Sequence, residues 1–416
     1  MILFGGKVYG TDMQDELITK LAGHIDETYA SGITLNPKEV IEACNVLATR
    51  VKAGEYDDIV MPFMKTFNID KAQIDRLTDL FTADGLTTKL NTELPPLEDT
   101  DGIRKKYYPL GVLLHIAAGN FDVLPAYSVI EGLLAGNINI LKLPMGDSGL
   151  SVKLLTELIE ISPSIAPFIY VFDVPSTETA SLIKLANISN GIAVWGGDAA
   201  LTAARQWAPV NTKIISWGHK LSFAYAEPNC TDAELKDLAR SICMTNQTLC
   251  SSCQGIFVDT LSDEELENFG KRFYKIFSEV NEQSTPVDYG MRAKNAINLY
   301  NERLEGTSGK ILSGNGISVI IREDSELELS YMYRNVWIKK LPMDKIYTLR
   351  KHKSHLQTAA VLTSDDKKRN MAETGLASAG VVRLTPPGAM SDTLMGEAHD
   401  GTYALREYSR IVEFRS

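Results

Sequence analysis

The spacing of hydrophobic positions changes near residue 100. Before that point, apolar side chains recur every three or four positions, most clearly over residues 17–25 and 40–51. Such spacing gives a helix one apolar face, so we expect residues 1–100 to be mainly helical. From Tyr108 onward, short apolar runs alternate with helical patterns. The chain therefore combines two kinds of secondary-structure pattern.

The alternating region predicts a parallel sheet covered by helices. The expected strands are 111–116, 138–143, 168–172, 192–195 and 212–216, and the helices between them are 122–135, 149–160, 178–188 and 198–206. Strands and helices in strict alternation build a doubly wound sheet, because each helix returns the chain to the edge where the next strand begins. Ligands of such sheets bind at the carboxyl ends of the strands, and dinucleotides are common among them.

A second unit of strands and helices follows Gly218. It contains a long predicted helix over 263–280 and a predicted strand over 380–384, after which Pro386 and Pro387 interrupt the pattern. A last strand is expected over 408–414. We therefore predict three parts: a helical N-terminal part with a cofactor-binding domain over 1–217, a catalytic domain over 218–385, and a C-terminal tail over 386–416.

The composition is that of an ordinary globular protein, with 44% hydrophobic and 23% charged residues. The 42 basic and 53 acidic residues give a formal net charge of −11, which disfavours general affinity for nucleic acid or anionic membranes. No run of about 18 apolar residues and no signal-peptide pattern occurs, so we expect no membrane span. Five cysteines, an odd number, argue against a disulfide framework. A cytoplasmic protein fits these features best.

Cys250 is the candidate nucleophile. It follows a polar run and precedes an apolar segment that is typical of a strand. The small hydroxyl residues Ser251 and Ser252 would leave its sulfur accessible. An ionised thiol attacks acyl carbons well, whereas a cysteine packed in a core is inert. Cys250 and Cys253 also form a C-x-x-C pair, which would suit zinc or dithiol cycling. One such pair supplies two of the four ligands that zinc needs, so we expect no metal.

Three further segments sit where strands of the predicted sheet end. Asn120 follows the first strand and either caps the next helix or points at an oxyanion. Lys142 ends the second strand, where a nucleotide's ribose or phosphate would attract a cation. Trp195, Gly196 and Gly197 end a later strand, as a plain turn or as a close approach for a cofactor. No G-x-G-x-x-G fingerprint follows a predicted strand, which disfavours an ordinary Rossmann dehydrogenase.

In this order, the segments resemble the aldehyde dehydrogenase superfamily, and most closely its LuxC-type acyl-CoA and acyl-protein thioester reductases. The resemblance runs from about Tyr108 to the C-terminus. The similar segments are 108–114 with Gly119 and Asn120 (oxyanion), 135–144 (cofactor lysine), 195–198 (glycine turn beside the nicotinamide), 246–252 (nucleophile), 356–364 (a structural strand) and 399–401 with the tail. The resemblance implies an α/β, aldehyde-dehydrogenase-like fold: a doubly wound parallel-sheet cofactor domain and an α/β catalytic domain.

Two departures from the hydrolytic aldehyde dehydrogenases are informative. Ser216 stands at the place of the glutamate that activates water in those enzymes. A second glutamate, which helps to anchor the nicotinamide ribose, is missing from 331–335. Without a base for water, a thioester on Cys250 would be formed from or passed to another thiol rather than hydrolysed. The departures therefore favour a thioester reductase.

The resemblance implies a reaction and its participants. An acyl group from acyl-CoA, an acyl carrier or an acyl-protein passes to Cys250, Asn120 and the Cys250 backbone N–H bind the oxyanion, and hydride reduction gives an aldehyde. His219 is a candidate for proton transfer or for tuning the thiol, or else a hydrogen-bonded structural group. His399 would shape the mouth of the site. The expected cofactor is NADP, since Lys142 would meet a 2′-phosphate, with NAD as the alternative.

Two other functions stay open from the sequence. A CoA-acylating aldehyde dehydrogenase would run the same chemistry in the oxidative direction. A non-catalytic binding or scaffold subunit would keep the fold without the reaction, and the missing glutamates leave room for it. The resemblance also implies a homo-oligomer, in which the C-terminal tail over 386–416 would pair with another subunit, as exposed strand edges readily do.

Overall fold

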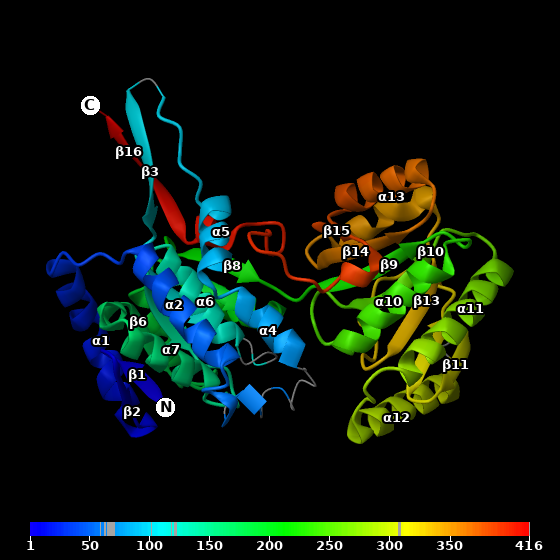
Figure 1. Cartoon of the computed structure of the whole chain (residues 1–416), viewed down its shortest axis with the longest axis horizontal. Coiled ribbons are helices and arrows are strands. Elements are labelled where there is room, and N and C mark those ends of the chain that lie inside the picture. Colours follow the sequence, from blue (N-terminus) through cyan, green and yellow to red (C-terminus); the bar gives the residue numbers. More distant parts are fainter. Residues whose placement is uncertain are drawn as a thin grey trace. The chain divides into compact units, whose positions relative to one another are not determined.

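The computed structural model describes residues 1–58, 60, 61, 64, 71–100, 102–117, 119, 123–306 and 309–415. It divides into two compact units (Figure 1). The first comprises Met1–Gly218 together with Leu394–Ser416, and the second comprises His219–Thr393. The first unit is therefore built from both ends of the chain, and the second from one continuous segment.

The first unit is organised around a seven-stranded sheet, counted over the described residues, in the order β2-β1-β6-β5-β4-β7-β8. Its strands are β1 Ile2–Phe4, β2 Lys7–Tyr9, β4 Val112–Ile116, β5 Ile138–Lys142, β6 Ile169–Phe172, β7 Gly191–Trp195 and β8 Lys213–Trp217. The strands from β4 to β8 are parallel. The chain runs outward from β4 to β6 and then crosses to β7 on the other side of β4, so the predicted doubly wound sheet is confirmed.

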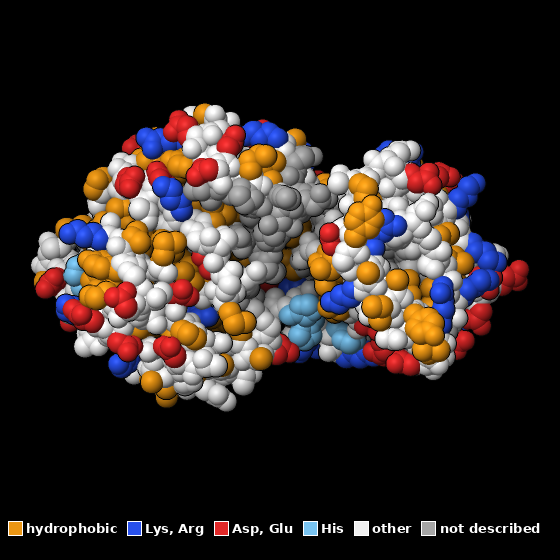
Figure 2. Space-filling model, turned by 90° about the horizontal axis from the view of Figure 1, so that it is seen from below, with side chains coloured by type: hydrophobic (Ala, Val, Ile, Leu, Met, Phe, Trp, Pro, Cys, Tyr) orange, Lys and Arg blue, Asp and Glu red, His pale blue; other side chains and the backbone are white. Residues whose placement is uncertain are grey.

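Helices cover this sheet. They are α1 Gln14–Ala30, α2 Pro37–Lys52, α4 Lys71–Asp79, α5 Ala83–Glu93, α6 Leu124–Leu134, α7 Leu150–Ile161, α8 Thr179–Asn187, α9 Asp198–Trp207 and α14 Ala404–Glu407. Asn36 starts α2 by accepting the Lys38 N–H, with Pro37 in the first turn. Within the described residues, no helix has both the length and the apolar composition that a membrane crossing requires. Figure 2 shows acidic, basic and apolar side chains interspersed over one face of the molecule.

The expectation of a mainly helical start missed β1 and β2. The three side chains of β1 are buried, and Leu3 pairs with Val171 of β6. A strand of three residues is too short to show an alternating pattern. Its conformation depends on the free edge of β6, which lies about 170 residues further along the chain.

The C-terminal segment is fastened to the first unit in two places. β16 Ser409–Arg415 pairs antiparallel with β3 Ile103–Pro109 along its whole length, and the two strands project from the unit (Figure 1). The buried carboxylate of Glu93 accepts the Leu405 N–H at 2.8 Å and pairs with Lys89 at 2.6 Å. Lys89 also pairs with Glu131 at 2.8 Å. Burial raises the pKa of Glu131, although Lys89 opposes this effect.

The second unit is also built on a seven-stranded sheet within the described residues, in the order β11-β12-β13-β10-β9-β14-β15. Its strands are β9 Leu221–Ala226, β10 Cys253–Val258, β11 Lys310–Gly314, β12 Ile317–Ile321, β13 Asn335–Lys340, β14 Leu356–Leu362 and β15 Arg383–Thr385. All pairs are parallel except β11 with β12. The helices are α10 Asp232–Thr245, α11 Asp263–Glu282, α12 Tyr289–Glu305 and α13 Asp366–Ala379.

The strand expected over 380–384 begins later, at Arg383. Gly380 adopts a φ of 118° and ends α13, where its N–H donates to the carbonyls of Leu376 and Ala377. A left-handed glycine after the last helical residue is a common helix end. Residues 380–382 therefore complete the helix end and lead into the strand.

Candidate active site

Cys250 lies on the turn between α10 and β10. A capping box of Thr231 and Glu234 starts α10, and Asn246, with a φ of 48°, ends it. β10 then begins at Cys253. Cys250 is exposed, while the other four cysteines, all in the described part of the chain, are buried. The predicted nucleophile is therefore accessible.

Residues of two neighbouring strands, β14 and β9, donate hydrogen bonds to the sulfur and to the carbonyl of Cys250, respectively. The side-chain amide of Gln357 donates to the Cys250 sulfur at 3.4 Å. The hydroxyl of Ser222 donates to the Cys250 carbonyl at 2.7 Å and accepts the Thr358 N–H at 3.0 Å. Ser222 is the second residue of β9, and Gln357 is the second of β14. The site therefore lies at the amino ends of β9, β10 and β14.

The side chain of Gln247 holds the turn that carries Cys250 in place. This side chain is buried, and the φ of Gln247 is 63°. The amide nitrogen donates to the carbonyls of Cys253 at 2.9 Å and Asn335 at 3.0 Å, and the amide oxygen accepts the Asn335 N–H at 3.0 Å. The Gln247 amide thus bonds to both the N–H and the carbonyl of Asn335, as the backbone of an adjacent strand would do.

A buried arginine supports the same turn. Arg334 is 1% exposed and follows two further left-handed residues, Met332 and Tyr333. Its guanidinium donates to the side-chain oxygens of Asn246 at 3.0 Å and Asn281 at 2.5 Å, and to the carbonyls of Thr285 at 2.6 Å and Cys243 at 3.2 Å. Burial lowers the pKa of Arg334. Left-handed backbone is costly for non-glycine residues, and these hydrogen bonds hold it in place.

The buried cysteines are poor nucleophiles. Burial raises the pKa of Cys44, Cys230 and Cys253 to about 12. The Cys253 thiol donates to the Gly255 carbonyl at 3.2 Å. The C-x-x-C pair therefore joins one accessible thiol to one that stays protonated, which disfavours dithiol cycling. Across the described residues, no three His, Cys, Asp or Glu side chains gather as a metal site.

The other two predicted catalytic residues are placed less fully. Asn120 lies outside the described residues, so its oxyanion role stays a prediction. His219 is exposed, and its carbonyl accepts a hydrogen bond from Nδ1 of His355 at 3.1 Å. The two imidazole rings lie 6.4 Å apart. A role for His219 in proton transfer also stays a prediction, and the amide that reaches the Cys250 sulfur belongs to Gln357.

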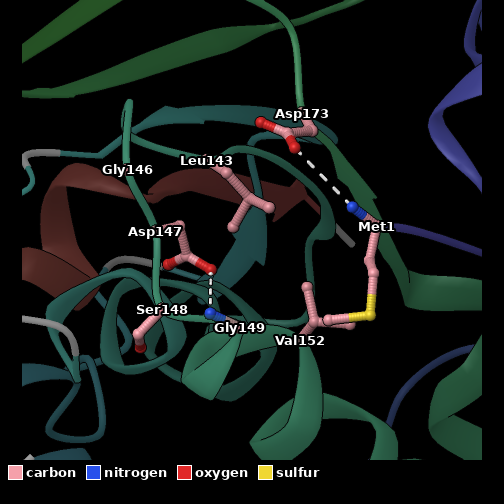
Figure 3. Close-up of a pocket in the computed structure, with 8 residues that line it drawn as sticks. All are labelled: Met1, Leu143, Gly146, Asp147, Ser148, Gly149, Val152 and Asp173. Atoms are coloured by element: carbon pink, nitrogen blue, oxygen red, sulfur yellow. Dashed lines mark hydrogen bonds and ion pairs between the residues drawn. The ribbon is translucent and has the colours of Figure 1, made fainter.

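Lys142 lies at the carboxyl end of β5, in the first unit, and is 7% exposed. Burial lowers the pKa of its ammonium, and the nearby Asp173 partly offsets that effect. A pocket of about 260 Å³ opens beyond the ends of β5 and β6, and residues 146–149 and Asp173 line it (Figure 3). Asp147 in its wall accepts the Gly149 N–H at 2.8 Å. The α-amino group of Met1 also lines this pocket and lies 3.6 Å from the Asp173 carboxylate.

Trp195 belongs to an aromatic cluster at the ends of β7 and β8. Its indole N–H donates to the Ser128 hydroxyl at 2.9 Å, and its ring stacks on Trp217 at 5.4 Å. The His399 ring lies 5.2 Å from both tryptophans. This cluster attaches the C-terminal segment to the sheet, so Trp195 has a packing role beside its predicted cofactor role.

The two glycines after Trp195 differ in their surroundings. The Gly196 N–H donates to the Trp217 carbonyl at 3.2 Å, and a side chain at this position would press on Ala200. A Cβ on Gly197 would meet no atom within 4 Å among the described residues. Gly197 precedes α9, whose first backbone N–H groups attract negative charge. The first turn of α9 also carries the acidic side chain of Asp198.

Several solved structures of aldehyde dehydrogenases and related dehydrogenases share this architecture. Glyceraldehyde-3-phosphate dehydrogenase GapN from Methanocaldococcus jannaschii superposes with a TM-score of 0.74 at 13% identity, over 98% of this chain and 95% of that chain. Aldehyde dehydrogenase 21 from Physcomitrella patens gives 0.73 at 14% identity, over 100% and 98%. At these identities the likeness shows the fold alone, and it confirms the predicted aldehyde-dehydrogenase-like class.

The sequence comparison narrows the class to a family. The family model described as acyl-CoA reductase (LuxC) matches residues 38–411, and the chain belongs to this family. The long-chain acyl-protein thioester reductase of Vibrio harveyi is 23% identical over 317 residues, covering 74% of this chain and 64% of that protein. That of Aliivibrio fischeri is 24% identical over 316 residues, with the same coverage. The chain therefore spans about two thirds of the length of these relatives.

The sequence interpretation missed three residues that hold the nucleophile: Gln247, Arg334 and Gln357. Gln247 lies inside the segment matched to the nucleophile, but no local pattern marks its burial. Gln357 is the second residue of a mostly apolar strand, and a long polar side chain in such a strand was the available signal. Arg334 lies in 331–335, where the sequence showed only a missing glutamate.

Proposed function

We propose that the chain reduces an acyl thioester to an aldehyde through an acyl intermediate on Cys250, with a nicotinamide dinucleotide as the cofactor. The observation that carries the proposal is the placement of Cys250: an exposed thiol with an amide N–H on its sulfur, on a turn fixed by buried side chains. Membership of the acyl-CoA reductase family supports the reaction class.

The first half-reaction is acyl transfer. The Cys250 thiolate attacks the carbonyl carbon of an acyl-CoA or acyl-protein thioester and forms a carbon–sulfur bond. The tetrahedral oxyanion collapses, the donor sulfur leaves with the electron pair, and this sulfur takes up a proton. We propose that the Cys250 backbone N–H and Asn120 bind the oxyanion, as the resemblance implies.

The second half-reaction consumes the acyl group on Cys250. The reduced nicotinamide dinucleotide, when bound, would supply a hydride, that is, a proton with two electrons, which forms the new bond to hydrogen at the acyl carbon. Collapse of the reduced centre breaks the bond to Cys250, whose sulfur leaves with the electron pair, and the aldehyde is released. Ser216, exposed on β8, has no group that would activate water at neutral pH, which supports reduction over hydrolysis.

The residues of the first unit fit the cofactor class. We propose that Lys142 binds the adenosine ribose or its 2′-phosphate, that Gly196 and Gly197 let the pyrophosphate approach α9, and that Trp195 borders the nicotinamide. The cation of Lys142 supports NADPH, whereas Asp173 beside it supports a ribose hydroxyl, as in NADH. Fluorescence titrations of the protein with NADPH and NADH compare the two directly.

The experiment that tests the proposed function is the intact mass of the protein after incubation with saturated acyl-CoAs of different chain length. The wild-type protein is expected to gain the mass of one acyl group and to consume NADPH or NADH afterwards. Cys250→Ala should lose both, and Cys243→Ala, which removes a buried thiol on α10, should keep both. An acyl adduct that persists in Cys250→Ala contradicts the proposal.

The same assay separates the physiological donors and directions. Acyl-CoA is compared with an acylated carrier protein as donor, and the rate of aldehyde formation with that of aldehyde oxidation in the presence of CoA. A scaffold without catalysis would give no adduct with any donor. We also propose a homo-oligomer, which light scattering of the purified protein tests.

A further inference from the structure

We propose that Gln357 is a catalytic residue, whose side-chain amide stabilises negative charge on the Cys250 sulfur both when this sulfur attacks and when it leaves. The inference rests on the proposed function, because it assigns a second residue to the same nucleophile. The direct observation is the donor contact from Gln357 Nε2 to Cys250 Sγ at 3.4 Å. Sulfur is a large acceptor, and this distance is ordinary for an N–H···S hydrogen bond.

The position of Gln357 requires an explanation beyond packing. It is 2% exposed on β14, where the following side chains are those of Thr358, Ala359, Ala360 and Val361. A buried carboxamide costs free energy of desolvation, which an apolar residue of the same size would avoid. This buried carboxamide reaches the exposed thiol of Cys250.

The backbone of β14 helps to position the Gln357 side-chain amide against the Cys250 sulfur. Thr358, the next residue, donates its N–H to the Ser222 hydroxyl, and this hydroxyl donates to the Cys250 carbonyl. Gln357 therefore reaches the sulfur through its side chain, while the backbone N–H of Thr358 orients the Ser222 hydroxyl toward the carbonyl of Cys250. One strand thus fixes the sulfur and the carbonyl of the nucleophile together.

A neutral donor suits both half-reactions. A hydrogen bond to the charged form of a group favours that form, so the amide N–H favours the thiolate over the thiol. In the reductive half-reaction, the electron pair of the breaking carbon–sulfur bond stays on sulfur, and the same N–H stabilises it. An amide neither takes up nor releases a proton at neutral pH, so it does not compete with the proton transfers of the reaction.

The test is the rate at which iodoacetamide alkylates Cys250 as a function of pH, measured by mass spectrometry without substrate or cofactor. Gln357→Leu removes the donor at similar size. Gln357→Glu keeps the shape and replaces the donor by a carboxyl group. Thr358→Val is the matched control: it changes the adjacent residue of β14, whose hydroxyl has no hydrogen-bond partner within the described structure, and it preserves the backbone N–H.

Gln357→Leu is expected to slow alkylation at pH 7 about tenfold, the effect of one hydrogen bond to a charged group, and to move the midpoint of the pH profile upward. Gln357→Glu should slow it further, because a carboxylate repels a thiolate. Thr358→Val should match the wild type. An unchanged profile in Gln357→Leu, with an unchanged midpoint of thermal unfolding, overturns the inference. If Gln357→Leu does not fold, the same comparison is made with Gln357→Met.

The alkylation readout separates this inference from the proposed function. If acyl-CoA fails to acylate the wild-type protein while Gln357→Leu still slows alkylation, the proposed function fails and the donor role of Gln357 stands. If acylation occurs and Gln357→Leu alkylates like the wild type, the proposed function stands and Gln357 is a packing residue. Single-turnover acylation of Gln357→Leu should fall by the same factor as alkylation.

Discussion

The two units have similar sheets, but their candidate site residues lie at opposite ends of the strands. Each has a mostly parallel sheet with an antiparallel edge, formed by β1 and β2 in the first unit and by β11 in the second. In the first unit, Lys142 and Trp195 lie at carboxyl ends of strands, where doubly wound sheets bind ligands. In the second unit, Cys250 precedes β10 and lies at the amino ends of the strands.

This difference shows what each kind of site needs from the fold. A strand end followed by a helix start offers backbone donors without further support. The turn between α10 and β10, which carries Cys250, follows a helix end instead. Residues with left-handed backbone and buried polar side chains, such as Gln247 and Arg334, support it. We therefore expect the second unit to be more sensitive to single substitutions around its site than the first unit.

Arg334→Met should give the largest effect and tests this comparison in the second unit. The substitution leaves up to four acceptors without their donor, and we expect a loss of about 3 kcal/mol in the free energy of unfolding. Urea unfolding followed by tryptophan fluorescence measures it. Arg240→Met, at an exposed ion pair on α10, is the control and should cost less than about 0.5 kcal/mol. Equal effects of the two substitutions would contradict a supporting role for Arg334.

The first unit has a pH-dependent group of its own in β4. His115 is buried, with its ring nitrogens 2.7 Å from the Ser128 hydroxyl and 3.0 Å from the Asn139 side-chain oxygen. Burial lowers the pKa of His115 to about 4, although Asn139 opposes the shift. The folded chain therefore keeps this imidazole neutral at a pH where the unfolded chain protonates it.

The sign of the effect follows from this lowered pKa. The stability that His115 contributes is complete above the unfolded pKa of about 6.5 and falls as the pH drops toward 4. Between pH 7.5 and pH 5 we expect a loss of about 2 kcal/mol from this group. His115→Gln does not titrate, so its thermal midpoint should fall less over this interval than that of the wild type. The same fall in both proteins would count against a neutral His115.

Lys142→Met should give the smallest effect, and the effect should be on nucleotide affinity rather than on the free energy of unfolding. If the proposed role of Lys142 is right, loss of its cation from the carboxyl end of β5 is expected to weaken nucleotide binding about tenfold, with a larger loss for NADPH than for NADH if a 2′-phosphate is bound there. Titration by nucleotide fluorescence measures both affinities. The rate of Cys250 alkylation without nucleotide should not change, and a change in that rate would show that the two sites are not independent.

Sequence patterns identified β4 to β7 because these strands are short, mostly apolar and fully buried runs between helices. They also identified β8, which is only partly buried, and they missed β1, β2 and β3. The same patterns placed Cys250 and Lys142. They did not identify Gln357, which is 107 residues from its partner Cys250, or Arg334, which is 88 residues from Asn246. Local periodicity describes which face of an element is apolar, whereas these contacts depend on how distant elements meet.

The first unit is completed by the last segment of the chain, through β16 on β3 and the contacts of Glu93 with Leu405. The second unit, residues 219–393, is one continuous segment, so its sheet can form without the pairing of β16 with β3. A chain shortened after residue 393 would therefore keep every described strand of the second sheet, while β3 would lose the strand that pairs with it over Ile103–Pro109.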